Sequence, residues 1–144
     1  MKLLPHSYKA NVIGRPENPL TTSCQNFPNI DVSPPVEFDG PGTEWSPEEL
    51  FMASISNCLV LSFRVISKMS KFDWLTIECE SQGVLDKVDR QIKFTKVFTK
   101  ATLTVNAEAD KEKAEKLLEK AEKACFITNT LSCESFFECE IKVT

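Results

Sequence analysis

Residues 46–63 read SPEELFMASISNCLVLSF, and this stretch decides the fold. It begins as helices begin, with Ser46 at the N-cap, Pro47 in the first helical position and Glu49 placed to close a capping box. No Asp, Glu, Lys or Arg occurs from Leu50 to Phe63. Because a helix that is apolar nearly all round is buried nearly all round, we expect a central helix over about residues 47–70.

The apolar positions of this helix predict which of its faces packs inward. They step by three and four residues, the spacing that brings side chains onto one helical face. Cys58 belongs to this face, where a thiol is most often a small buried apolar residue. The positions predicted to face inward are Phe51, Ile55, Cys58, Ser62, Val65 and Met69.

The sequence after this helix predicts a hairpin, a second helix and a last strand. Residues 74–86 and 91–106 alternate as strands do, and a change of phase in the second predicts a bulge near residues 96–98. Asp110 is placed to cap an amphipathic helix over about residues 111–123. Residues 125–131 suggest a turn with a short helical piece, and residues 136–144 alternate again.

The sequence before the helix predicts only short strands. Residues 7–14 alternate modestly, and residues 15–46 hold six of the eight prolines, which favours edge strands and turns over a helix. The order of elements is that of an α+β protein with an antiparallel sheet. A length of 144 residues fits a single domain over residues 1–144.

Composition argues against several classes of protein. The formal net charge of −4 does not suggest a nucleic-acid or anionic-membrane partner. The apolar run at the N-terminus is too short for a signal peptide, and no apolar stretch approaches the length that spans a membrane. We therefore expect a soluble, cytoplasmic protein.

We expect the cysteines to be free thiols rather than members of a disulfide framework or ligands of a metal ion. A disulfide framework is not expected without a secretion signal. No C-x-x-C pair occurs and His6 is the single histidine, so we expect no metal and no cofactor. Most of the thiols are expected to be buried apolar residues, with Cys79 and Cys139 facing inward on strands. The six are Cys24, Cys58, Cys79, Cys125, Cys133 and Cys139.

Two short strings resemble the OsmC/Ohr family of thiol-dependent hydroperoxide reductases. Residues 46–58 resemble the family's first-cysteine helix, in which a Pro-Glu start is followed ten residues after the Glu by the reactive Cys. Residues 123–131, which read KACFITNTL, resemble its second-cysteine segment near the end of an amphipathic helix. Many members carry Pro directly after this second Cys, whereas this chain has Phe126. The order of elements also matches, over about residues 7–144.

The resemblance implies a fold, an assembly and an activity. The fold would be OsmC-like, and two chains would form an intertwined homodimer with their long helices packed centrally. Cys58 would attack hydrogen peroxide or an organic hydroperoxide, and Cys125 would then form a disulfide with it. A lipoyl group or a small dithiol would be the reductant. Glu48 matches the family's glutamate at the helix start, and Arg15, after a glycine, matches its arginine near the N-terminus.

Physical chemistry gives Arg15 a specific role in this scheme. Burial in an apolar helix raises the pKa of a thiol, so Cys58 would need a neighbouring cation to become a thiolate. Of the three arginines, Arg64 lies about 120° around the same helix and Arg90 falls in a predicted hairpin turn. Arg15 is therefore expected to lower the pKa of Cys58, with its guanidinium oriented by Glu48.

Cys125 is expected to be the poorer attacker. It lies near the end of the second helix, where the helix dipole disfavours an anion, unless residues 125–131 begin a helix of their own. Two other functions remain open: a small-molecule or acyl-chain binding dimer with little turnover, and a structural protein with inert core thiols. Equally, Glu48 could serve only as a helix-start carboxylate, and Arg15 could be an ordinary surface residue.

Overall fold

The computed structural model describes residues 1–144, and the chain divides into two compact units. The first unit is Met1–Phe51 and the second is Met52–Thr144. Each unit contains one three-stranded sheet. A single domain over residues 1–144 stays a prediction.

Short strands separated by proline-rich turns build the first unit. They are β1 (Asn11–Ile13), β2 (Leu20–Ser23) and β3 (Ile30–Val32), paired antiparallel in the order β1-β2-β3. The 3₁₀ helix η1 (Val36–Phe38) follows. The predicted first strand is shorter than expected, since residues 7–10 lie outside it.

The long helix α1 runs from Pro47 to Met69 and begins with the predicted capping box. The Glu49 N–H donates to Ser46 Oγ at 3.2 Å, and the Ser46 N–H donates to Glu49 Oε2 at 3.0 Å. Ser46 Oγ also donates to the same carboxylate oxygen at 3.0 Å. Two main-chain donors that the helix itself leaves unpaired are thus satisfied.

Loss of this cap is expected to destabilise the protein measurably. Ser46→Ala removes the acceptor for the Glu49 N–H and should lower the free energy of unfolding by about 1 kcal/mol. Ser46→Gly is the matched control, because glycine at an N-cap costs only a few tenths of a kcal/mol. Equilibrium urea unfolding followed by circular dichroism measures both. Equal losses for the two variants would contradict the cap argument.

The side of α1 that is buried differs from the predicted one. Its buried residues are Ile55, Leu59, Phe63 and Ser67. Val65 and Met69, which were expected to face inward, are 59% and 80% exposed. The prediction of a helix buried all round was therefore wrong for a single chain. Apolar residues occur on every side of α1, so their spacing could not select the side that the sheet covers.

The apolar composition of α1 also meets a general criterion for membrane-spanning helices. An 18-residue window has a mean hydropathy of 1.6, so by length and composition alone the helix could cross a membrane. The sequence prediction counted uninterrupted apolar residues, whereas this average also spans polar ones, and a core helix of a soluble protein meets the same criterion. α1 instead packs against a sheet through Leu59 and Phe63, which is how a core helix of the same composition is used.

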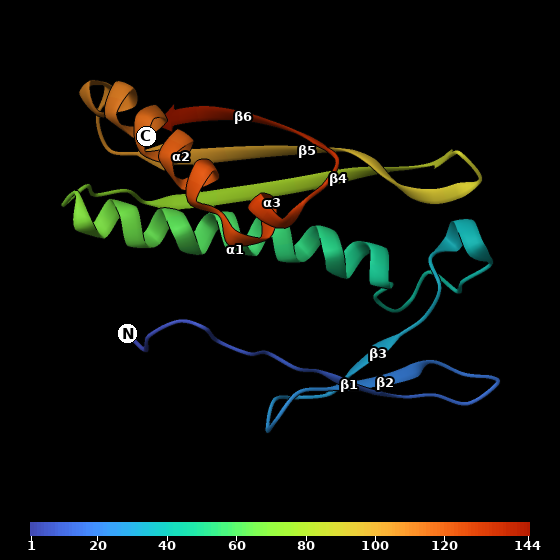
Figure 1. Ribbon diagram of the computed structural model, residues 1–144. Coiled ribbons are helices and arrows are strands. Elements are labelled where there is room, and N and C mark those ends of the chain that lie inside the picture. Colours follow the sequence, from blue (N-terminus) through green and yellow to red (C-terminus); the bar gives the residue numbers. More distant parts are fainter. The chain divides into compact units, whose positions relative to one another are not determined.

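The second unit is built on a sheet in which β5 (Gln91–Val105) is central. β4 (Thr76–Val88) pairs with β5 antiparallel, and the two form a long hairpin (Figure 1). The predicted bulge is present at Thr95, because Val84 pairs with Lys96 and Leu85 with Phe94. β6 (Glu134–Val143) pairs with β5 parallel, so this sheet is not wholly antiparallel as expected. A helical connection carries the chain back along the sheet before β6 begins, so β6 runs in the same direction as β5.

That connection holds the 3₁₀ helix η2 (Glu108–Asp110), α2 (Lys111–Ala124) and the short α3 (Phe126–Thr130). Asp110 occupies the N-cap of α2, but its side chain makes no capping hydrogen bond. The inward faces of α1, α2 and the sheet share one core. Its buried members are Leu59, Phe63, Phe72, Ala101, Leu103, Val105, Ala114, Leu117, Leu118 and Ala121.

Candidate functional site

Two elements of the second unit bring the predicted pair of thiols together. Cys58 lies midway along α1, and Cys125 is the single residue between α2 and α3. The Cys125 thiol hydrogen-bonds to Cys58, and this bond lowers the pKa of Cys58 while it raises the pKa of Cys125. Contact between two thiols is the geometry from which a disulfide forms without a large rearrangement.

Cys58 is surrounded by hydrogen-bond donors. Partial burial raises the pKa of Cys58, but four hydrogen bonds lower it by more than burial raises it. They come from the main-chain N–H of Ile127, the Cys125 thiol, the main-chain N–H of Phe126 and the Ser62 hydroxyl. The balance leaves the pKa of Cys58 below the ordinary value for a thiol. A lowered pKa means more thiolate at neutral pH, and the thiolate is the nucleophile.

This result overturns one premise of the sequence argument. Burial was expected to leave Cys58 with a raised pKa, to be corrected only by an arginine. Residues 126–127 instead supply main-chain donors from within the second unit. The sequence offered one usable signal, since residues 125–131 were expected to hold a short helical piece. The effect of this helical piece on the pKa of Cys58 depends on how α3 packs against α1, and the spacing of apolar residues does not predict that packing.

Cys125 has the opposite character. It is fully buried, and burial raises its pKa although the Thr128 hydroxyl donates to its Sγ at 3.1 Å and the Thr128 N–H adds a second bond. The bond to Cys58 and the negative charge on that residue raise the pKa of Cys125 further. The pKa values of the two thiols are therefore shifted in opposite directions, so Cys58 loses its proton at a lower pH than Cys125. Burial is the main cause of the raised pKa of Cys125, rather than the helix dipole that the sequence argument used. That Cys125 is the poorer attacker stays a prediction.

A third and a fourth thiol lie close by in the sheet. Cys79 on β4 and Cys139 on β6 both pair with Ala101 of β5, and both pack against the core as predicted. Burial raises the pKa of Cys79, partly offset by a bond from Ser56, and the charge of Cys125 raises it again. Two strand spacings separate Cys79 from Cys139, roughly 9.5 Å, so they are too far apart for a disulfide.

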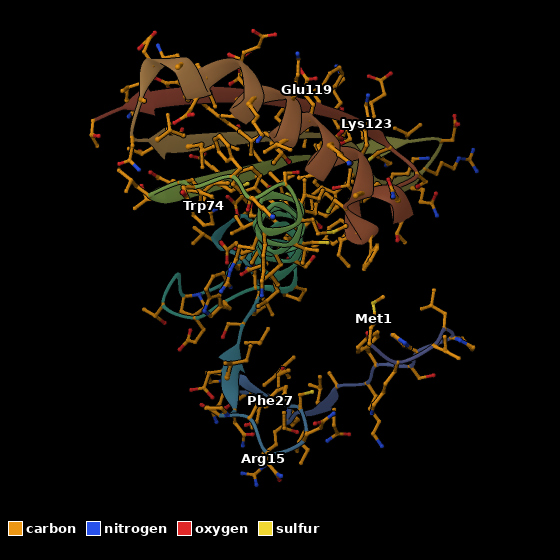
Figure 2. The ribbon with its side chains drawn as sticks, turned by 90° about the vertical axis from the view of Figure 1, so that its left-hand side faces the viewer. Met1, Arg15, Phe27, Trp74, Glu119 and Lys123 are labelled. Carbon is orange, nitrogen blue, oxygen red and sulfur yellow. The ribbon has the colours of Figure 1, made fainter.

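Arg15 and Glu48 lie in the first unit, where they line one hollow of about 770 Å³. Its wall is largely apolar and includes Leu20, Val32 and Phe38. Glu48 Oε2 is buried and has no hydrogen-bond partner, whereas the Arg15 side chain is exposed (Figure 2). No ion pair joins them in this chain, since the salt bridges are all elsewhere. The expected ion pair between Glu48 and Arg15 is thus not formed, although both residues line the same hollow.

Comparison with known proteins places this arrangement in context. A family model described as OsmC-like protein matches residues 40–140. The uncharacterized protein YmaD of Bacillus subtilis is 25% identical over 130 residues, covering 88% of this chain and 86% of YmaD. An uncharacterized protein of Methanocaldococcus jannaschii is 32% identical over 89 residues, covering 62% of this chain and 46% of that protein.

Solved structures share the whole fold at low sequence identity. An OsmC-like protein of unknown function from Vibrio cholerae superposes with a TM-score of 0.83 at 20% identity, covering 94% of this chain and 99% of that one. An organic hydroperoxide resistance protein OsmC from Legionella pneumophila gives 0.75 at 21% identity, with coverage of 98% and 100%. The organic hydroperoxide resistance protein OhrB of Bacillus subtilis gives 0.68 at 22% identity, with coverage of 94% and 98%.

Proposed function

Because the chain belongs to the OsmC-like protein family, we propose that it is a peroxidase that reduces hydrogen peroxide or organic hydroperoxides through Cys58 and Cys125. One observation carries the proposal: the two thiols are in contact, and their pKa values are shifted in opposite directions. A reactive thiolate beside a protonated thiol is what attack followed by resolution requires. Two of the three solved structures compared above are named as organic hydroperoxide resistance proteins.

The proposed reaction uses the two thiols in turn. The Cys58 thiolate attacks one peroxide oxygen, the O–O bond breaks, and the departing alkoxide or hydroxide takes up a proton. Cys58 is thereby oxidised to a sulfenic acid, and the hydroperoxide is reduced to an alcohol or to water. The Cys125 thiol then displaces the sulfenic oxygen as water and leaves a Cys58–Cys125 disulfide. A dithiol or lipoyl reductant returns both thiols and becomes a disulfide itself.

The remaining parts of the proposal concern Arg15, Glu48 and a second chain. Arg15, held by Glu48, would stabilise negative charge as the peroxide bond breaks. Glu48 Oε2 is buried without a partner, so it is ready to accept such a guanidinium. An intertwined homodimer would cover the exposed apolar side of α1, including Leu61 and Val65. Such a dimer would act in the cytoplasm.

A single stoichiometric experiment tests the proposal. One equivalent of hydroperoxide should consume two thiols per chain, and peptide mapping by mass spectrometry should find Cys58 bonded to Cys125. Cys79 and Cys139 should stay reduced, because the pKa of each is raised by burial. Slow loss of thiols scattered over several cysteines would instead indicate inert core residues and no peroxidase.

The hollow in the first unit supports one alternative. With about 770 Å³ and a mainly apolar wall, it has the size and character of a small-molecule site. A small-molecule or acyl-chain binding dimer with little turnover would use this hollow and leave the thiols idle. In that case hydroperoxide would leave the thiol count unchanged.

A further inference from the structure

A threonine side chain contacts the sulfur of the second thiol. The Thr128 hydroxyl donates a hydrogen bond to Cys125 Sγ at 3.1 Å, and this sulfur is fully buried. We propose that Thr128 stabilises negative charge on Cys125 when this thiol closes the disulfide with Cys58 and when it leaves again as the disulfide is reduced. The inference rests on the proposed function for these two steps and names the side chain that assists them.

The spacing of the two residues and the fold of α3 hold this hydroxyl in place. Cys125 and Thr128 are three residues apart, a separation that brings two side chains to the same side of a helical turn. The Asn129 N–H donates to the Cys125 carbonyl at 2.9 Å, and the Asn129 side chain donates to the Lys123 carbonyl at 3.2 Å. A donor fixed before the reaction needs no reorganisation when charge develops on its acceptor.

Burial distinguishes the two sulfurs of the proposed disulfide. Cys58 is partly exposed, whereas Cys125 is 0% exposed. The sulfur that an external thiolate attacks in a disulfide depends on which of the two it can reach. A dithiol reductant should therefore attack Cys58, and this makes Cys125 the leaving group.

Cys125 carries negative charge in both steps. In the first, Cys125 gives up its proton and its sulfur attacks the sulfenic sulfur of Cys58. An S–S bond forms, the S–O bond breaks, and the proton leaves with the oxygen as water. In the second, a thiolate of the dithiol bonds to Cys58, the S–S bond of the protein breaks, and Cys125 takes its electron pair and then a proton. The other thiol of the dithiol then displaces Cys58 and completes the reductant's own disulfide.

Charge on Cys125 is costly without a donor. Burial disfavours the charged form of a thiol and raises the pKa of Cys125. A thiol with a higher pKa leaves a disulfide more slowly. A hydrogen bond to a charged group stabilises that group enough to change a rate by about tenfold. Loss of the Thr128 hydroxyl should therefore slow both steps that charge Cys125, and it should leave the attack of Cys58 on the peroxide unchanged.

The first arm of the test is a single turnover of the reduced full chain. One equivalent of hydroperoxide is added, samples are quenched with dimedone, and mass spectrometry quantifies sulfenic acid on Cys58 and the Cys58–Cys125 disulfide. Thr128→Val keeps the shape of the side chain but removes the hydroxyl. It should form sulfenic acid at the unmodified rate and close the disulfide about tenfold more slowly. Thr128→Ala should give the same slowing, and Thr128→Ser should restore the rate.

The second arm needs no hydroperoxide. The pair is oxidised with diamide, which becomes a hydrazine as the disulfide forms, and dithiothreitol then reduces the disulfide. Reduction should be about tenfold slower in Thr128→Val. Thr130→Val is the matched control, because the Thr130 hydroxyl donates to the Phe126 carbonyl of the same short helix at 2.8 Å and not to a sulfur. It should keep the unmodified rates in both arms.

A further measurement separates an effect on Cys125 from an effect on the attacking thiol. The rate of Cys58 alkylation by iodoacetamide at each pH, its alkylation profile, should stay that of the unmodified chain in Thr128→Val, because the hydroxyl contacts Cys125. A profile shifted to higher pH would overturn the inference, since the hydroxyl would then act on Cys58.

The remaining outcomes decide the inference separately from the proposed function. Unchanged rates of disulfide formation and reduction in Thr128→Val overturn it. Equal slowing in Thr130→Val also overturns it, because the stability of α3 and not the bond to sulfur would then be responsible. Slow reduction of the diamide-formed disulfide in Thr128→Val alone supports it even if the chain consumes no hydroperoxide, and in that case only the peroxidase proposal fails.

Discussion

Cys58→Ser is expected to abolish hydroperoxide consumption, the largest effect of any single substitution in this chain. Serine fills nearly the same volume, but its hydroxyl does not ionise near neutral pH and is a poor nucleophile towards peroxide. The variant should remain folded, because Cys58 is not among the buried core residues. A colorimetric assay of residual hydroperoxide, with a dithiol present as reductant, measures the loss.

Two companion variants make this result specific. Cys24→Ser should keep full activity, because Cys24 lies in the first unit and its Sγ only donates to the Lys9 carbonyl, which a serine hydroxyl can also do. Cys125→Ser should consume one equivalent and then stop, leaving a sulfenic acid on Cys58 that dimedone traps. If Cys58→Ser still reacted while Cys125→Ser did not, the roles of the two thiols would be reversed.

Much of the fold could be predicted because it depends on short-range signals. The capping box of Ser46 and Glu49 fixed the start of α1, and its length follows from the uninterrupted apolar run. Alternation located β4 and β5, and the change of phase in β5 located the bulge at Thr95 to within a residue or two. Each of these features is decided by neighbours in sequence, which a single chain displays directly.

The features that were missed depend on long-range packing. Apolar residues surround α1, so periodicity could not tell the side bearing Leu59 from the side bearing Val65. The parallel pairing of β6 with β5 depends on where α2 and α3 return the chain. The direction of the pKa shift of Cys58 depends on which main-chain groups of residues 126–127 meet it. None of these contacts can be predicted from the spacing of residues along the chain.

The proximity of the two candidate thiols could be predicted, but the electrostatics around them could not, and the catalytic roles of these residues stay a prediction. Cys58 and Cys125 were chosen from resemblance, and they lie in contact. Arg15 was chosen by elimination among the side-chain cations, and main-chain donors were left out of that comparison. Once donors from residues 126–127 account for the lowered pKa of Cys58, Arg15 needs a different task. Stabilising the charge that develops on the departing peroxide oxygen is the one we propose.

Arg15→Ala is therefore expected to slow hydroperoxide consumption at pH 7 by about 100-fold while leaving the alkylation profile of Cys58 unchanged. Folding should be little affected, because the Arg15 side chain is exposed. The sequence argument alone predicted that raising the pH would restore part of the rate. We expect no such selective recovery: the rates of the variant and of the unmodified chain should rise with pH in parallel, because Cys58 ionises over the same pH range in both.

Two further variants separate the possible roles of Arg15. Arg15→Lys should restore little activity, because an ammonium lacks the planar pair of donors that a carboxylate such as Glu48 can hold. A second variant is Phe126→Pro, which removes the Phe126 N–H that lowers the pKa of Cys58. Combining it with Arg15→Ala should multiply the two losses at pH 7, because one acts on the departing oxygen and the other on the attacking sulfur. If Arg15→Ala alone raised the pH at which Cys58 is alkylated, Arg15 would belong to the sulfur after all. The main-chain donors would then be insufficient to form the thiolate.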